Sequence, residues 1–274
     1  MKNILVPTDF SEQAENALHV AAQLAQRYDA EIFLLHLLEL PLHQVDALSS
    51  HSELPEAMFF MKLAQKRFTD MMSRDYLQNV KVHETVEFNQ SFNQLPQTCE
   101  EKNIDLIVMG SHGVSGLKEI FIGSNTEKVV RNSNIPVLVI KKPHEEFTVN
   151  DFVFASDFTN DNKQTYLQAV SIAEKFDAKL HLVMVNTANN FTTTMEAKER
   201  ISEFTKDASY DNYSVSIFND ETVEQGIVNF SQDINADLIG ISTHGRQGIA
   251  HFFNGSISED LVNHSKRPVM TFKI

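Results

Sequence analysis

Apolar residues in this chain fall into two repeating patterns, short continuous runs and stripes spaced at three and four residues. Continuous runs are typical of strands buried on both faces, and spaced stripes are typical of helices that bury one face. In the first half, strands are predicted at 4–6, 32–38, 80–88, 106–109 and 135–140. Helices are predicted after a cap at Ser11, over 57–71, over 95–102 and from Asn125 to Asn132. This alternation predicts an α/β protein whose parallel sheet carries helices on both faces.

The same pattern occurs twice along the chain. Residues 105–140 and 237–272 align without a gap at an offset of 132, with 14 identities in 36 positions. The two beginnings also match, since ILVPTDF at 4–10 resembles FVFASDF at 152–158, at an offset of 148. The chain is therefore predicted to contain two copies of one domain rather than a single large domain.

The two copies differ in length. Their offsets differ by 16, so the first copy carries about 16 extra residues, which we place at 39–60, where prolines and polar residues interrupt any period. The segment KKPHEE after the first copy is polar and contains a proline, as expected of a linker. We expect a first domain over 1–142, a linker over 143–149 and a second domain over 150–274.

Composition narrows the class of protein. Of the 274 residues, 42% are hydrophobic and 22% are charged, which is ordinary for a globular protein with its own core. The net charge of −14 argues against nucleic acid or an anionic membrane surface as a partner. It does not exclude a small anion held by neutral backbone amides. Residues 1–142 carry a net charge of −5 and the remainder −9, so the second copy is the more acidic.

The sequence contains one cysteine and shows neither a signal peptide nor a membrane-spanning segment. Cys99 is the only cysteine, so an intrachain disulfide is excluded, and a lone thiol favours a reducing compartment. The apolar stretch at the start is three residues long, which is too short for a signal peptide. No apolar run approaches the roughly 20 residues that a membrane helix needs. We therefore expect a cytoplasmic protein that has no membrane partner.

A glycine-rich segment follows the strand predicted at 106–109. It reads GSHG at 110–113 and, after nine residues, GS at 123–124, where a helix opens. Glycines let the backbone approach a ligand closely, and the free N–H groups at a helix N-terminus bind anions. The hydroxyls of Ser124 and Thr126 would add donors. The segment predicts a phosphate cradle, with a tight turn that holds no ligand as the alternative; it is neither a Walker A loop nor a dinucleotide fingerprint.

Taken together, the segments ILVPTDFS, LLHL, DLIVMGSHG and GSNTEKVV resemble the motifs of the universal stress protein family. The resemblance covers essentially all of both copies. It implies two tandem doubly wound domains, each with a five-stranded parallel sheet in the order 3-2-1-4-5. It also implies that the domains pair through their fifth strands as a pseudo-two-fold dimer within one chain. Whether two chains associate further as a homodimer stays open.

For members with the full glycine motif, the resemblance implies a site for an adenine nucleotide, ATP or AMP, with or without Mg²⁺. Asp9 would contact ribose or adenine beside Pro7 and Thr8, and the backbone of Leu37 would read the adenine edge. The ribose and phosphates would be lined by Met109, Gly110, His112 and Gly113. The phosphates would be held by Gly123, Ser124, Asn125 and Thr126.

The second copy has different residues at several positions of this motif, including those of Gly110 and Leu37. Ser242 stands at the position of Gly110, and Val185 stands at that of Leu37. A Cβ at position 242 is expected to obstruct the path of the phosphates. Nucleotide binding is therefore expected mainly in the first domain.

The main hypothesis is an adenine-nucleotide-binding regulatory or stress-response protein that is not an enzyme, with slow ATP hydrolysis at most. Phosphoryl transfer needs a metal site and a group that positions the attacking nucleophile. This cradle consists mainly of backbone amides and hydroxyls, and no catalytic or metal-ligating residue is predicted. The alternative is an interaction or assembly module without nucleotide, acting through sheet edges and the apolar helix at 57–72. In that helix Met58 to Met61 are consecutive and cannot all face one core.

A third hypothesis is a phospho-acceptor domain with Asp9 at the end of its first strand. Such domains need an acidic cluster for Mg²⁺, and no second acid adjoins Asp9 in the sequence. This hypothesis is therefore disfavoured.

Overall fold

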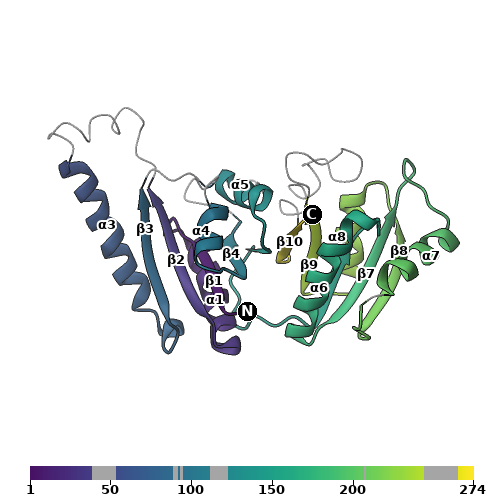
Figure 1. Ribbon diagram of the computed structural model, residues 1–274, viewed down its shortest axis with the longest axis horizontal. Helices are drawn as coiled ribbons and strands as arrows, with labels where there is room; N and C mark the ends of the chain where they lie inside the picture. Colours follow the sequence, from purple (N-terminus) through teal and green to yellow (C-terminus); the bar gives the residue numbers. More distant parts are fainter. Residues whose placement is uncertain (39–53, 89–91, 93–94, 112–122, 207, 244–264) are drawn as a thin grey trace.

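In the computed structural model, the chain forms two α/β halves that share one continuous sheet (Figure 1). The structure describes the whole chain except residues 39–53, 89–91, 93–94, 112–122, 207 and 244–264. Helices flank the sheet in both halves, as the alternating sequence pattern predicts.

The elements of the first half follow the predicted order. They are β1 (Asn3–Pro7), α1 (Glu12–Tyr28), β2 (Glu31–Leu38), α3 (Leu54–Met72), η2 (Asp75–Leu77), β3 (Val82–Phe88), α4 (Leu95–Glu101), β4 (Leu106–Gly110), α5 (Ser124–Asn132) and β5 (Val137–Ile140). The predicted cap of the first helix is confirmed, because the side chain of Ser11 accepts a hydrogen bond from the backbone N–H of Ala14.

The second half has five strands in the same alternation with helices, except that residues 244–264, between its last two strands, lie outside the described residues. Its elements are β6 (Asp151–Ala155), η4 (Asn160–Asn162), α6 (Lys163–Phe176), β7 (Lys179–Asn186), α7 (Thr194–Thr205), β8 (Tyr213–Asn219), α8 (Val223–Asp233), β9 (Leu238–Thr243) and β10 (Val269–Lys273). Its first strand and helix correspond to those of the first half, as the duplication predicts.

All ten strands form one mixed sheet in the order β3-β2-β1-β4-β5-β10-β9-β6-β7-β8. Within each half the strands are parallel and follow the order 3-2-1-4-5, which confirms the expected topology. The halves meet where β5 and β10 run antiparallel, with Leu138 opposite Met270. The predicted pairing of the two copies through their fifth strands is therefore confirmed.

The length difference between the two copies lies partly in a helix. The extra residues were expected at 39–60; residues 39–53 lie outside the described residues, but α3 begins at Leu54, so 54–60 are helical. Pro55 does not interrupt this helix, because in the first turn its missing N–H would have no intrahelical acceptor. Helix α3 has 19 residues, whereas its counterpart α7 has 12.

The two faces of the sheet carry different helices. Buried residues of α1, α3, α6 and α7 form one hydrophobic core that extends across both halves. Buried residues of α4, α5 and α8 pack on the opposite face. Neighbouring residues of a strand alternate between these cores, as with Ile4 and Leu5. No described helix combines the length and the hydropathy that crossing a membrane requires.

The connection between the halves packs against α1. Phe147 is 1% exposed, and its backbone N–H donates to the side-chain oxygen of Gln23 at 2.6 Å. The side-chain nitrogen of Gln23 donates in turn to the carbonyl of His144 at 3.1 Å. The hydroxyl of Tyr28 reaches the carbonyl of Lys175 in α6 at 2.7 Å. A segment that reads as a polar linker is thus part of the shared core.

Candidate functional site

A cavity of about 300 Å³ lies at the carboxyl ends of β1, β2 and β4, beside the start of α5. Ligands of open α/β sheets bind at this edge of the sheet. The residues that line the cavity are Pro7, Thr8, Asp9, Ala14, His36, Leu37, Phe92, Met109, Gly110, Gly123, Ser124, Asn125 and Thr126. The structure therefore brings together ten of the twelve residues that the sequence singled out. The other two, His112 and Gly113, lie outside the described residues.

The turn between β1 and α1 positions Asp9 at the cavity. The hydroxyl of Thr8 accepts from the N–H of Phe10 at 3.0 Å, and Asp9 Oδ1 accepts from the N–H of Ser11 at 3.0 Å. Phe10 has φ of 62°, a left-handed conformation that is rare for a bulky side chain. Strain of this kind persists only where the surrounding structure enforces it, and it concentrates at functional sites.

His36 is a cavity residue that sequence reasoning missed. Its Nδ1 lies 2.7 Å from the carbonyl oxygen of Thr8, which can only accept, so Nδ1 carries the hydrogen and Nε2 of the neutral ring is an acceptor. The ring packs against Phe10 with centroids 4.5 Å apart. Burial lowers the pKa of His36, while the Thr8 carbonyl and the charge of Asp9 act in the opposite direction. The one feature of the sequence that could have indicated His36 is its position next to Leu37, near the end of a predicted strand.

The lowered pKa of His36 predicts a pH-dependent stability. A histidine whose folded pKa lies below its usual 6.5 binds fewer protons when folded, so the stability present above that value is lost as the pH falls through the folded pKa. We expect wild type to lose more stability than His36→Gln between about pH 7 and about pH 5. Thermal unfolding at a series of pH values measures this difference; equal losses in both proteins would contradict it.

Gly110 is required by a neighbouring helix. A Cβ built at this position would lie 2.6 Å from the backbone oxygen and 2.7 Å from the carbonyl carbon of Gln13 in α1. Backbone atoms cannot move aside as the end of a flexible side chain can. The close approach that the glycine permits is therefore between β4 and α1, and it is independent of any ligand.

The start of α5 presents backbone donors to the cavity. Its first intrahelical bond runs from Glu127 N–H to the carbonyl of Gly123, so the N–H groups of the three residues between them precede the helical ladder. Gly123, as N-cap residue, provides no side-chain acceptor for these groups. The Thr126 hydroxyl donates to the carbonyl of Gly110 at 2.8 Å and so ties α5 to β4. This changes the role expected of Thr126, whose hydroxyl hydrogen is directed to the backbone.

Comparison with known proteins identifies the family. The sequence profile of the Universal stress protein family matches residues 1–141 and 149–273. The chain belongs to this family. Universal stress protein MJ0531 of Methanocaldococcus jannaschii is 32% identical over 146 residues, which cover 53% of this chain and 85% of that protein. Universal stress protein Slr1230 of Synechocystis is 22% identical, and the match covers all of both chains.

A solved structure shares the tandem arrangement. The crystal structure of a universal stress protein from Archaeoglobus fulgidus matches with a TM-score of 0.68 at 23% identity, and the match covers 99% of this chain and 98% of that one. At this identity the likeness concerns the fold. This chain is thus a tandem universal stress protein with both halves in one sheet.

The second half of this universal stress protein keeps the turn but changes its surroundings. Phe158 repeats the left-handed conformation with φ of 55°. Asp157 Oδ1, however, accepts from the backbone and hydroxyl of Thr159 at 3.1 and 2.9 Å and from the Asn162 amide at 2.6 Å. Residues 244–264, which hold the second glycine motif, lie outside the described residues.

Ser242 does not point where the sequence suggested. It is fully buried, and its hydroxyl lies 2.7 Å from that of Thr165 in α6. The side chain at this position faces helix α6, so the structure gives no support to the expectation that it obstructs a phosphate path. Helix α6 begins six residues after Asp157, whereas α1 begins three residues after Asp9. The shifted helix start accompanies the replacement of glycine by serine.

Metal-binding groups do not gather near this cavity in the part of the chain that the structure describes. Over those residues, no group of three or more His, Cys, Asp and Glu side chains is placed to hold a metal ion. Asp9 provides the single carboxylate of the cavity lining given above. A Mg²⁺ ion here would take most of its oxygen ligands from phosphates and water, as Mg²⁺ commonly does.

Proposed function

We propose that this universal stress protein binds an adenine nucleotide, ATP or AMP, in the first-half cavity and acts as a regulatory protein. The observation that carries the proposal is the convergence of Asp9, the end of β2 and the uncapped start of α5 on one cavity. In this proposal, residues 1–142 and 150–274 are the two domains, and the ligand binds mainly in the first.

The chemistry of the lining fits the parts of a nucleotide. The carboxylate of Asp9 suits the hydroxyls of a ribose, which donate hydrogen bonds. Phe92 and Met109 are buried apolar side chains suited to the faces of a base. The N–H groups at the start of α5 suit phosphate oxygens, since a helix N-terminus carries partial positive charge. A volume of about 300 Å³ lies at the small end of the range for such sites.

The same lining favours binding over catalysis. Efficient phosphoryl transfer needs a positioned nucleophile and charged groups at the phosphates. Asp9 already holds the β1–α1 turn, and the residues around the start of α5 offer mainly backbone amides and hydroxyls. We therefore expect ATP hydrolysis at most far below ordinary enzyme rates.

Calorimetric titration with AMP and ATP tests the site. Asp9→Asn keeps an oxygen for the N–H of Ser11 but removes the charge, so the ribose loses a charge-assisted hydrogen bond. We expect binding to weaken about tenfold to a hundredfold, since such a bond contributes about 1.5–3 kcal/mol. Asp157→Asn in the second half is the matched control and is expected to change little.

Two outcomes would contradict this proposal. Equal loss of affinity in both variants would mean that the first half is not the principal site. Absence of AMP and ATP binding in wild type would remove the nucleotide function for both halves.

One observation favours the alternative of an interaction module. Helix α3 exposes apolar side chains on its outer face, with Met58 54% and Phe59 62% exposed. If this face is the functional surface, Phe59→Ser will abolish cellular function while AMP binding persists, and Asp9→Asn will leave cellular function intact. The opposite pair of results supports the nucleotide site.

A further inference from the structure

Three side chains form a hydrogen-bonded chain at the amino-terminal ends of the strands in the second half. Asp151 is the first residue of β6, His181 lies in β7 and Ser214 lies in β8. His181 Nε2 lies 2.7 Å from Asp151 Oδ1, and the hydroxyl of Ser214 lies 2.9 Å from His181 Nδ1. Within the second half, this edge is opposite to the one formed by the carboxyl ends of the same strands, because those strands are parallel.

Sheet register explains why the three meet. Ser214 is the direct cross-strand partner of His181, so their side chains share one face. Val153 is the partner of His181 on the other side, and Asp151, two residues earlier in β6, occupies the diagonal position on the same face. His181 lies 30 residues after Asp151 and 33 residues before Ser214 in the sequence. The three side chains meet because their strands are neighbours in the sheet.

The carboxylate determines the direction of both hydrogen bonds. Ionised Asp151 can only accept, so in the neutral imidazole Nε2 carries the hydrogen. Nδ1 then carries a lone pair and accepts the hydrogen of the Ser214 hydroxyl. The His181 side chain is 10% exposed, which limits its freedom to turn away. A hydroxyl that donates to an imidazole oriented by a carboxylate is the arrangement that activates serine as a nucleophile.

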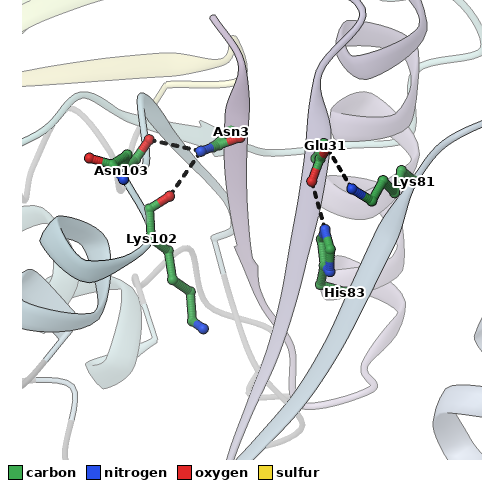
Figure 2. A network of polar contacts seen from close by, with 6 residues as sticks. All are labelled: Asn3, Glu31, Lys81, His83, Lys102 and Asn103. Carbon is green, nitrogen blue, oxygen red and sulfur yellow. Dashed lines mark hydrogen bonds and ion pairs between the residues drawn. The ribbon is translucent and has the colours of Figure 1, made fainter.

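The fold itself does not require this chain of contacts. The equivalent positions of the first half hold Asn3, Phe33 and His83. There Phe33 stacks on His83 with centroids 4.7 Å apart, and His83 bonds to Glu31 at 2.7 Å. Figure 2 shows Glu31 between Lys81 and His83, with Asn3 turned toward the backbone carbonyls of residues 102 and 103. The first half therefore offers a built-in comparison with the same backbone and no serine.

We propose that Ser214 is a nucleophile that accepts acyl groups from small activated donors such as aryl esters, thioesters and acyl phosphates. Ser214 Oγ attacks the acyl carbonyl carbon while its proton moves to His181 Nδ1. The bond from that carbon to the leaving group breaks, and the leaving group takes the proton from His181. The products are an O-acyl serine and the protonated leaving group, so no oxidant or further reactant is needed.

The position of Ser214 suits such a donor. Strand β8 is the last strand of the sheet on its side, so one of its edges has no strand neighbour among the described residues. Ser214 is only partly buried, unlike His181, which is 8% exposed as a whole residue. A small ester can therefore approach the hydroxyl, while the base behind it stays shielded.

The full-length protein treated with p-nitrophenyl acetate tests the proposal. Release of p-nitrophenolate gives the rate, and peptide mass spectrometry locates the acetyl group. We expect one acetyl group on Ser214 and about a hundredfold slower acetylation of that residue in His181→Asn, since a general base contributes at least that much. Ser216→Ala, which removes a partly buried serine two residues along β8, is the matched control and should leave the rate unchanged.

A second measurement separates a positioning role of Asp151 from a purely structural one. In Asp151→Asn, the acetylation rate should fall and the imidazole nitrogen signals of His181 in NMR spectra should report loss of the Nε2–H tautomer, while the thermal midpoint changes little. Acetylation confined to lysines, or an unchanged Ser214 rate in folded His181→Asn, would overturn the proposal. Neither outcome depends on nucleotide binding.

Discussion

Gly110→Ala is expected to destabilise the protein and to abolish nucleotide binding in the first half. The added Cβ would lie 2.6 Å from the Gln13 backbone oxygen, so α1 and β4 must separate. Overpacking of this kind costs about 1–3 kcal/mol, and occasionally more. The separation also displaces the Asp9 turn, which leads directly into α1, and the Thr126 hydrogen bond to the Gly110 carbonyl. Urea unfolding and calorimetry with AMP measure the two effects.

The duplicated half supplies the control for this prediction. Ser242 occupies the equivalent position, and its hydroxyl is bonded to Thr165 rather than pressed against backbone. Ser242→Ala should cost about 1 kcal/mol, through the lost hydrogen bond, and should leave AMP binding intact. If Gly110→Ala unfolds at the same urea concentration as wild type and binds AMP equally well, the close contact between α1 and β4 contributes neither to stability nor to nucleotide binding.

Phe147→Ala is expected to have the largest effect on stability. The side chain is 1% exposed in the connection between the halves, and its ring lies 6.3 Å from that of Phe176 in α6. Removing a buried phenylalanine leaves a cavity and typically costs about 3–5 kcal/mol. Because this residue belongs to the core that both halves share, the loss should appear as a lower urea midpoint for the whole chain.

An exposed phenylalanine provides the comparison for Phe147. Phe191 is 71% exposed, so Phe191→Ala removes the same atoms with little change in buried area and should shift the midpoint only slightly. A loss below about 1 kcal/mol for Phe147→Ala would show that the connection is a loose linker, as its polar sequence suggested.

Much of the fold was predictable because it depends on local sequence. Apolar runs predict strands, spaced apolar residues predict helices, and Ser11 marks a helix start that the structure confirms. Strand order and the pairing of the two copies through β5 and β10 followed from the resemblance to the family and are also confirmed. The start of α3 was predicted three residues too late, at 57, because Pro55 was taken to interrupt the helix, whereas proline is tolerated in the first turn.

The candidate site was predictable as a set of positions but less so in the role of each residue. The resemblance to the family indicated Asp9, Leu37 and the start of α5, which stand at strand and helix ends, where an α/β sheet places ligands. His36 and Phe92 were missed because lining a cavity depends on side-chain direction at the end of a strand and in a loop. No motif marks such residues in a single sequence.

The sequence by itself determined the repeated α/β pattern, the turn that carries Asp9 and the glycine motif of the first half. Those features depend on backbone propensities and on spacing over a few residues. Only the tertiary structure decided that Gly110 faces Gln13, that the Thr126 hydroxyl serves the backbone and that Asp151, His181 and Ser214 form one chain. The physical reason is that these contacts join residues on separate elements, and their distances depend on how helices and strands pack in three dimensions.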